Sequence, residues 1–209
     1  MTSEHQVIAP ALNPEQQIYA DLMDEARLRI HALRDGIDAR NHWVPRLLQE
    51  FLYLQLRMLC ETIAVGCLVA HGDIKNAGAL KLWQAPIIIK ELENLNPNFY
   101  PRGVRFRKSP SGETCLDDYA APQLSKADLV SLWNRTGSYL HRGSAKNLLA
   151  EHGKVLNVDL DPIILHGKKI LNLLEQHIIS SANGKGHLLV ALAADDAGGN
   201  AMVWVARSP

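Results

Sequence analysis

The chain has 209 residues, of which 47% are hydrophobic, and it carries 22 acidic and 22 basic residues. This length fits one domain, and the apolar content is enough for a core that needs neither disulfides nor a structural metal. The net charge of zero excludes the basic excess of proteins that bind nucleic acid regardless of sequence. Any contact with nucleic acid must therefore come from a local patch.

The cysteines and the N-terminal residues indicate a reducing compartment. Cys60, Cys67 and Cys115 form no C-x-x-C pair, and the first two are predicted to pack as small apolar side chains on a helix. The N-terminal segment has no basic stretch followed by an apolar run, so no secretory signal is expected. We therefore expect a cytoplasmic protein.

The first two predicted helices span about 13–39 and 44–70. An Asn-Pro pair begins the first helix, with asparagine as the cap and proline at the first helical position. Apolar residues follow one face of the first helix but surround the second, so the second is predicted to be central. Arg57 and Glu61 within it are costly in lipid, which favours a buried helix and no membrane.

The other predicted elements alternate helices with short β segments. They are a helix over 77–95, a basic β arm over 98–116, a helix over 125–142, a helix over 161–180 and a C-terminal hairpin over 187–207. The sum is a mainly α fold, a helical bundle of about five helices with two small β-hairpin attachments. We expect one domain over residues 1–209.

The helix predicted over 125–142 gathers polar groups on one side. At about 100° per residue, Leu129 and Leu132 mark a packed stripe with other apolar residues. The opposite side carries Asn134, Arg135, Ser138, His141 and Arg142. Arginine binds phosphate through two parallel hydrogen bonds, and histidine transfers protons near neutral pH. The set suits metal-independent cleavage of RNA by its own 2′-OH, and the alternative is an ordinary solvated helix face.

Arg135 and His141, separated by five residues near the end of a helix, resemble the R-x4-6-H motif of the HEPN superfamily. The resemblance implies a small helical bundle that, in many members, is a metal-independent endoribonuclease of toxin–antitoxin or phage-defence systems. It implies a homodimer whose motif helices form one cleft, with RNA as substrate and an antitoxin or defence protein as a further partner. Arg135 and His141 then form the catalytic pair, assisted by Asn134, Ser138 and Arg142.

Two positions differ from the pattern of that superfamily. Thr136 follows the motif arginine, where asparagine, aspartate or histidine is frequent, and Gly143 stands where some toxins carry a tyrosine that accepts a nucleotide. Thr136 and the zero net charge favour a second hypothesis. It is a catalytically silent HEPN-like module that dimerises or binds nucleic acid or a partner protein.

Arg57 and Glu61 lie four residues apart on the predicted central helix, so they can pair on one face. They are interpreted either as an ion pair that stiffens the bundle or as support for the site. In the second case Glu61 would orient Arg57, Arg135 or His141 across a cleft. The resemblance is compatible with such a supporting acid.

The predicted β arm is a candidate RNA-binding segment. Its basic residues are Arg102, Arg105, Arg107 and Lys108, and its aromatic residues are Phe99, Tyr100 and Phe106. Aromatic rings among cations suit single-stranded nucleic acid, and a solvated hairpin is an equal alternative. The histidines show no H-x3-H or H-E-x-x-H spacing, and no phosphate-binding loop is present. No metal and no cofactor are therefore expected.

Overall fold

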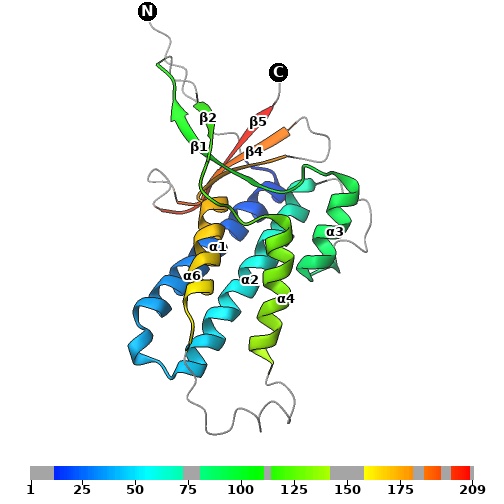
Figure 1. Cartoon of the computed structure of the whole chain (residues 1–209). Coiled ribbons are helices and arrows are strands. Elements are labelled where there is room, and N and C mark those ends of the chain that lie inside the picture. The colour runs from blue at the N-terminus through cyan, green and yellow to red at the C-terminus, as the bar shows by residue number, and fades with distance from the viewer. Residues whose placement is uncertain are drawn as a thin grey trace, which may run out of the picture.

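The computed structural model describes residues 12–72, 81–110, 114–141, 158–180, 186–193 and 199–207. Figure 1 shows a bundle of helices with a β-sheet across one end. The helices are α1 (Pro14–Asp38), α2 (Pro45–His71), α3 (Ala85–Leu95), α4 (Lys126–Leu140) and α6 (Asp161–Leu174), with a short 3-10 turn over Arg40–His42. The strands are β1 (Arg102–Lys108), β2 (Thr114–Asp118), β3 (Gln176–Ser180), β4 (Gly186–Ala191) and β5 (Met202–Arg207). The predicted mainly α fold with β-hairpins is confirmed.

Two helices begin at side-chain caps, and the cap at Asn13 is one that the sequence predicts. The Asn13 side chain accepts a hydrogen bond from the Gln16 backbone, and the Gln16 side chain accepts one from the Asn13 backbone. Ser125 and Asp128 form the same reciprocal pair at the start of α4. These reciprocal pairs, called capping boxes, satisfy backbone N–H groups that a helix leaves unpaired at its N-terminus.

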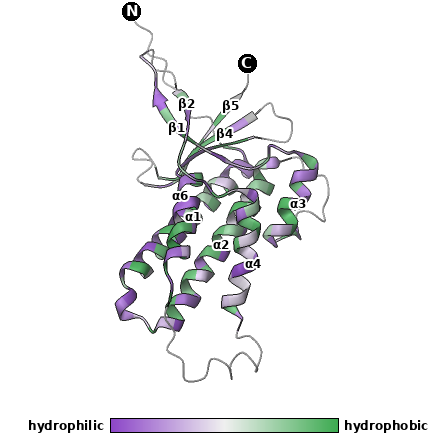
Figure 2. Cartoon of the chain, in the orientation of Figure 1, coloured by the Kyte–Doolittle hydropathy of each residue, from purple (hydrophilic) through white to green (hydrophobic). Residues whose placement is uncertain are grey.

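Helix α2 is the central element of the bundle. It packs most extensively against α1 and α4, and Figure 2 shows that it is apolar along much of its length. By length and composition α2 alone among the described helices could span a membrane, but 67% of its most apolar window is buried inside the molecule. Cys60 and Cys67 are 0% and 1% exposed, as predicted, and burial raises the pKa of both thiols.

The strands form one antiparallel sheet in the order β2-β1-β3-β4-β5, so the two predicted hairpins, β1–β2 and β4–β5, are present and belong to a single sheet. The segment Gln176–Ser180, predicted as the end of a helix, is the strand that joins the two hairpins. Its side chains alternate in burial, with His177 and Ile179 facing the core, which is the period of a strand. Gly103 allows β1 to pass close to α6, since a Cβ on residue 103 would lie 2.5 Å from the carbonyl oxygen of Asn172 in α6.

Helix α3 is shorter than predicted. It begins at Ala85, with proline in its first turn, and residues 82–84 are not helical. Pro86 has no backbone N–H and would break a helix running through it from 82, whereas it fits a first turn. The predicted start at 77 lies outside the described residues.

A buried hydrogen bond joins the bundle to the sheet. Tyr19 of α1 and His177 of β3 are 1% and 0% exposed, and the Tyr19 hydroxyl lies 2.8 Å from His177 Nε2. His177 Nδ1 lies 2.9 Å from the Leu174 carbonyl oxygen. A carbonyl can only accept, so Nδ1 carries the proton of the neutral ring and Tyr19 donates to Nε2. Burial lowers the pKa of His177 to about 4 from an ordinary value of 6.5.

We predict that the protein loses stability on mild acidification because His177 must remain neutral. The unfolded chain binds this proton below pH 6.5 and the folded chain only near pH 4. The neutral His177 ring therefore makes its full contribution to the free energy of unfolding above pH 6.5. This contribution, about 3 kcal/mol in all, is lost as the pH falls to 4. Urea unfolding at several pH values measures the loss.

A matched pair of variants tests the assignment to His177. His31→Gln, at an exposed position, should keep the pH dependence, and His177→Gln should reduce it. If the second variant does not fold, proton NMR of the wild-type ring gives the titration midpoint directly. A midpoint near 6.5 for His177 would contradict the prediction.

Candidate functional site on helix α4

The structure places the polar residues of α4 on the side that the sequence predicts. Leu129, Leu132 and Thr136 are buried against the bundle. The residues found exposed are Asn134, Arg135, Ser138 and His141. Arg142, the fifth predicted member, lies outside the described residues.

The end of α4 differs from the prediction. The helix stops at Leu140 rather than Arg142, and His141 has extended backbone angles, φ −95° and ψ 138°. Gly137 in the last turn lowers the intrinsic preference for continuing the helix. His141 thus caps the helix, so its direction does not follow the helical wheel that places Arg135.

A compact polar cluster joins α2 to α4 beside this face. The Arg57 guanidinium lies 3.2 Å from the Glu61 carboxylate, and the Trp133 indole N–H donates to the same carboxylate at 2.8 Å. Arg57 also stacks over the Trp133 ring at 4.0 Å from its centroid. We call these three residues the Arg57 cluster. Glu61 therefore orients Arg57 and Trp133, and no hydrogen bond links it to Arg135 or His141 among the described residues.

Two tyrosines flank Arg135, and the sequence analysis missed both. The rings of Tyr53 and Tyr139 stack with centroids 3.7 Å apart and planes 5° apart. Burial, followed by the hydrogen bond to Tyr139, raises the pKa of Tyr53, while the positive charge of Arg135 acts against that rise. The negative charge of Asp159 makes a smaller contribution that also raises the pKa of Tyr53. Tyr53 precedes Arg57 by one helical turn, and this spacing is the one signal that could have identified it.

The side chains of Arg135 and His141 have no hydrogen bond or ion pair to another described residue. Such side chains can bind an external anion without first breaking an internal contact. His141 lies one residue beyond the end of α4 and has extended backbone angles, so the helix does not set the direction of its side chain relative to Arg135. One chain therefore does not bring both groups to one point through helix geometry alone.

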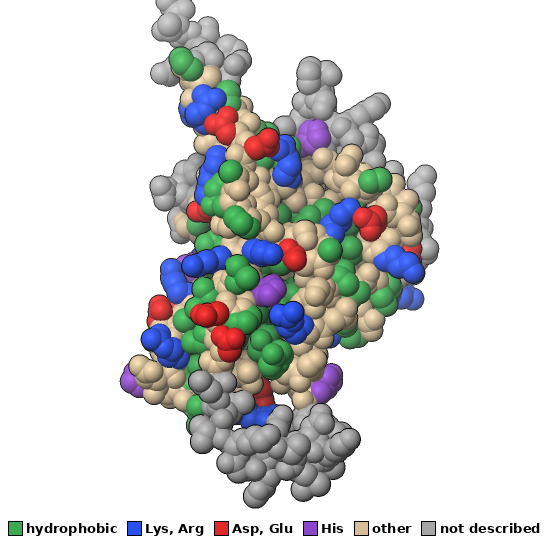
Figure 3. Space-filling model, in the orientation of Figure 1, with side chains coloured by type: hydrophobic (Ala, Val, Ile, Leu, Met, Phe, Trp, Pro, Cys, Tyr) green, Lys and Arg blue, Asp and Glu red, His purple; other side chains and the backbone are tan. Residues whose placement is uncertain are grey.

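The arginines of the basic arm are paired with acids. Arg105 lies 2.7 Å from Glu175 and over the Tyr119 ring, and Arg107 lies 2.9 Å from Asp117. Arg102 pairs with Asp118. Lys108 donates to the Thr114 hydroxyl. Figure 3 shows blue and red side chains side by side along this hairpin, so the arm presents alternating charge rather than one basic face.

The aromatic residues near the arm take part in packing. Phe99 is 1% exposed, and the Tyr100 hydroxyl donates to the Leu124 carbonyl oxygen. Phe106 meets Trp204 of β5 edge to face, with centroids 6.0 Å apart. These rings are engaged within the protein, so base stacking on them would require a rearrangement.

Within the described ranges, no group of three histidine, cysteine, aspartate or glutamate side chains could hold a metal ion. Comparison with known proteins adds no assignment, because no family model, no curated protein and no solved structure matches the chain. The resemblance to the HEPN superfamily therefore remains a hypothesis carried by Arg135 and His141.

We predict that Trp133→Phe destabilises the fold by about 2 kcal/mol. The phenyl ring retains the stacking with Arg57 but removes the N–H that donates to the Glu61 carboxylate, a hydrogen bond to a charged acceptor. Thermal and urea unfolding measure the change. Trp83→Phe is the matched control, because Trp83 is 58% exposed, and it should change stability by less than about 0.5 kcal/mol. Equal effects of both substitutions would show that the hydrogen bond contributes nothing.

Proposed function

We propose that the protein is a metal-independent endoribonuclease of HEPN type that acts as a homodimer. Arg135 binds the scissile phosphate and stabilises its developing charge, and His141 transfers the proton to or from the reacting oxygens. The observation that carries the proposal is the exposure of both residues in the C-terminal part of α4 and at its cap, with side chains that make no hydrogen bond in the described part of the chain. Asn134 and Ser138 add donors on the same surface.

The dimer is proposed because one chain offers these groups without a shared cleft. Tyr53 in the N-terminal half of α2 stacks on Tyr139 in the last turn of α4, and Glu61 in the C-terminal half of α2 meets Trp133 in the middle of α4. Next to the C-terminal end of α4, Leu47 and Leu54 are 54% and 42% exposed. They lie seven residues apart and therefore on one face of α2. Apolar side chains exposed beside polar groups are typical of an interface.

Under this proposal Arg57 and Glu61, which the sequence suggested as direct support for the site, have a structural role. Arg57 and Glu61 act by holding α4 at a fixed position on α2, because both are engaged in the Arg57 cluster. Tyr53 and Tyr139 lie near enough to Arg135 to influence its position. An antitoxin or defence protein would act by covering the Arg135 face or by separating the subunits.

A catalytically silent binding module is the second candidate. It is favoured by the pairing of Arg102, Arg105 and Arg107 with acids, which leaves little free positive charge on the arm to bind the RNA backbone. Binding without cleavage would distinguish this module from the enzyme.

The enzyme proposal predicts cleavage of RNA in the presence of a chelator. His141→Ala and Arg135→Ala should each lower the cleavage rate by about 10² to 10⁴, as expected for loss of a proton-transfer or charge-stabilising group. Incubation with mixed single-stranded and structured RNAs and gel analysis of the fragments measure the rate. His42→Ala, at an exposed position elsewhere, is the control. Cleavage equal in all four proteins, or absent from the wild type, would contradict the proposal.

The dimer proposal predicts that Leu47→Asp combined with Leu54→Asp yields a folded monomer without RNA cleavage. Two carboxylates in an apolar interface lose hydration without gaining partners. Light scattering coupled to size-exclusion chromatography measures the mass. Leu28→Asp is the control, because Leu28 is 60% exposed on α1. A wild-type monomer, or a dimer that survives the double substitution, would count against this interface.

A further inference from the structure

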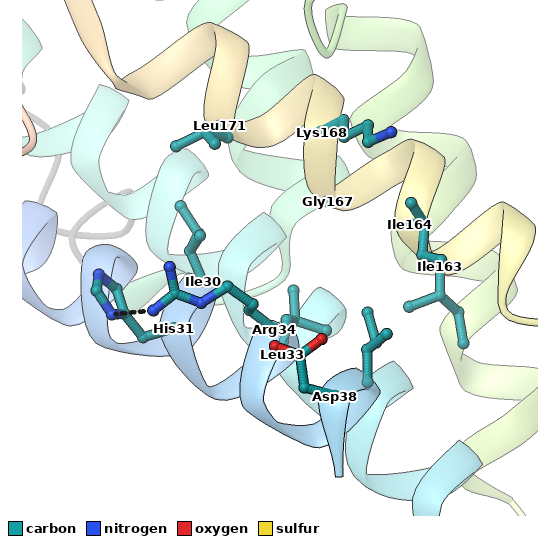
Figure 4. A pocket seen from close by; sticks show the side chains of 11 residues that line it. Ile30, His31, Leu33, Arg34, Asp38, Ile163, Ile164, Gly167, Lys168 and Leu171 are labelled. Atoms are coloured by element: carbon teal, nitrogen blue, oxygen red, sulfur yellow. Dashed lines mark hydrogen bonds between the residues drawn. The ribbon is translucent and has the colours of Figure 1, made fainter. Parts of the chain in front are cut away.

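A groove between α1 and α6 lies apart from the candidate site on α4. It has a volume of about 410 Å³ and is lined by residues of these two helices alone. Its aliphatic wall consists of Ile30, Leu33, Ile37, Ile163, Ile164 and Leu171. Figure 4 shows these side chains between the two helices. Volumes of this size are typical of small-molecule sites, which are mostly apolar with a few polar groups at their edge.

Gly167 leaves space in this groove that packing within the chain does not require. It lies in the middle of α6, where glycine costs about 1 kcal/mol relative to alanine. A Cβ at this position would meet only Leu33 Cδ1, at 4.0 Å. Alanine would fit there and would favour the helix. The absence of a side chain thus keeps the groove open at its centre.

The edges of the groove carry more positive than negative charge. Arg34 of α1 and Lys168 of α6 are the cationic lining residues, with Asp38 as the acid of the lining, and Figure 4 shows the two cationic side chains extending in different directions. Arg34 donates to His31 Nδ1 at 3.2 Å and lies 3.8 Å from Asp35. Lys168 has no hydrogen bond or ion pair with another described residue. Two permanent cations with apolar stems thus border an aliphatic slot.

We propose that this groove binds a long-chain carboxylate, with its alkyl chain along the aliphatic wall and its carboxylate at Lys168. The chain gains by leaving water, and the carboxylate gains charged hydrogen bonds at the edge. The wall is aliphatic and His31 is the one ring among the lining residues, so the lining favours an alkyl chain over an aromatic ligand.

Calorimetric titration of the full chain with dodecanoate below its micelle concentration tests the proposal. The expected result is saturable binding of one dodecanoate per chain. Acetate, which has the headgroup alone, should not bind. Dodecyltrimethylammonium, which has the same chain and the opposite charge, should bind at least about fivefold more weakly, as expected for exposed charges.

Two graded variants locate the site. Gly167→Leu fills the groove and should weaken dodecanoate binding at least tenfold, whereas Gly167→Ala should weaken it much less. Lys168→Glu should weaken dodecanoate binding and strengthen dodecyltrimethylammonium binding, whereas Lys90→Glu on the exposed side of α3 should change neither. Circular dichroism confirms that each variant is folded.

The outcomes separate the proposal from non-specific adsorption. Binding that survives Gly167→Leu, or that does not depend on the sign of the headgroup, would overturn it. A Gly167→Leu variant that fails to fold leaves Lys168→Glu and the two headgroups as independent tests. Absence of saturable binding to the wild type would also overturn it.

Discussion

Burial of α2 is the constraint on which the rest of the structure depends. This helix is apolar around most of its circumference, so the other helices must cover it or leave apolar surface in water. α1 approaches closely because Gly36 and Gly66 replace side chains at the contact, where a Cβ would meet Phe51 at 3.0 Å and Tyr19 at 3.3 Å. α4 covers the opposite side through ring stacking and the Arg57 cluster.

The charged residues Arg57 and Glu61 of α2 are stabilised by three interactions. These are their own ion pair, the hydrogen bond from Trp133 to Glu61 and the stacking of Arg57 on the Trp133 ring. Arg57 and Glu61 are 19% and 17% exposed, so each would be poorly hydrated if left alone. The Trp133 ring faces the guanidinium and its N–H faces the carboxylate, which satisfies both ends of the pair with one side chain. The partly buried Arg57 cluster therefore fixes the position of α4 along α2, and with it the position of the exposed Arg135.

Local features were predictable from the sequence, and contacts between distant segments were not. The caps at Asn13 and Ser125 depend on residues three positions away, and the exposed face of α4 follows from its repeat. By contrast, the pairing of Arg105 with Glu175 joins residues 70 positions apart. The sequence alone therefore did not indicate that this arginine of the arm is paired with an acid. The β3 strand was missed because its apolar residues continue those of α6, and only pairing with β1 and β4 selects the extended form.

The hydrogen bond between Tyr19 and His177 and the Arg57 cluster restrict which parts of this protein can change conformation. A neutral, fully buried histidine holds the sheet to the bundle, and the Arg57 cluster holds α4 to α2, so neither contact tolerates a large rearrangement at neutral pH. The exposed Leu47 and Leu54 lie on this fixed framework, beside the end of α4. A partner that covers them therefore meets Arg135 on a preorganised surface. Preorganisation lowers the entropic cost of binding and of positioning groups for reaction, and a second copy of the chain would bring a second Arg135 and His141 into such an assembly.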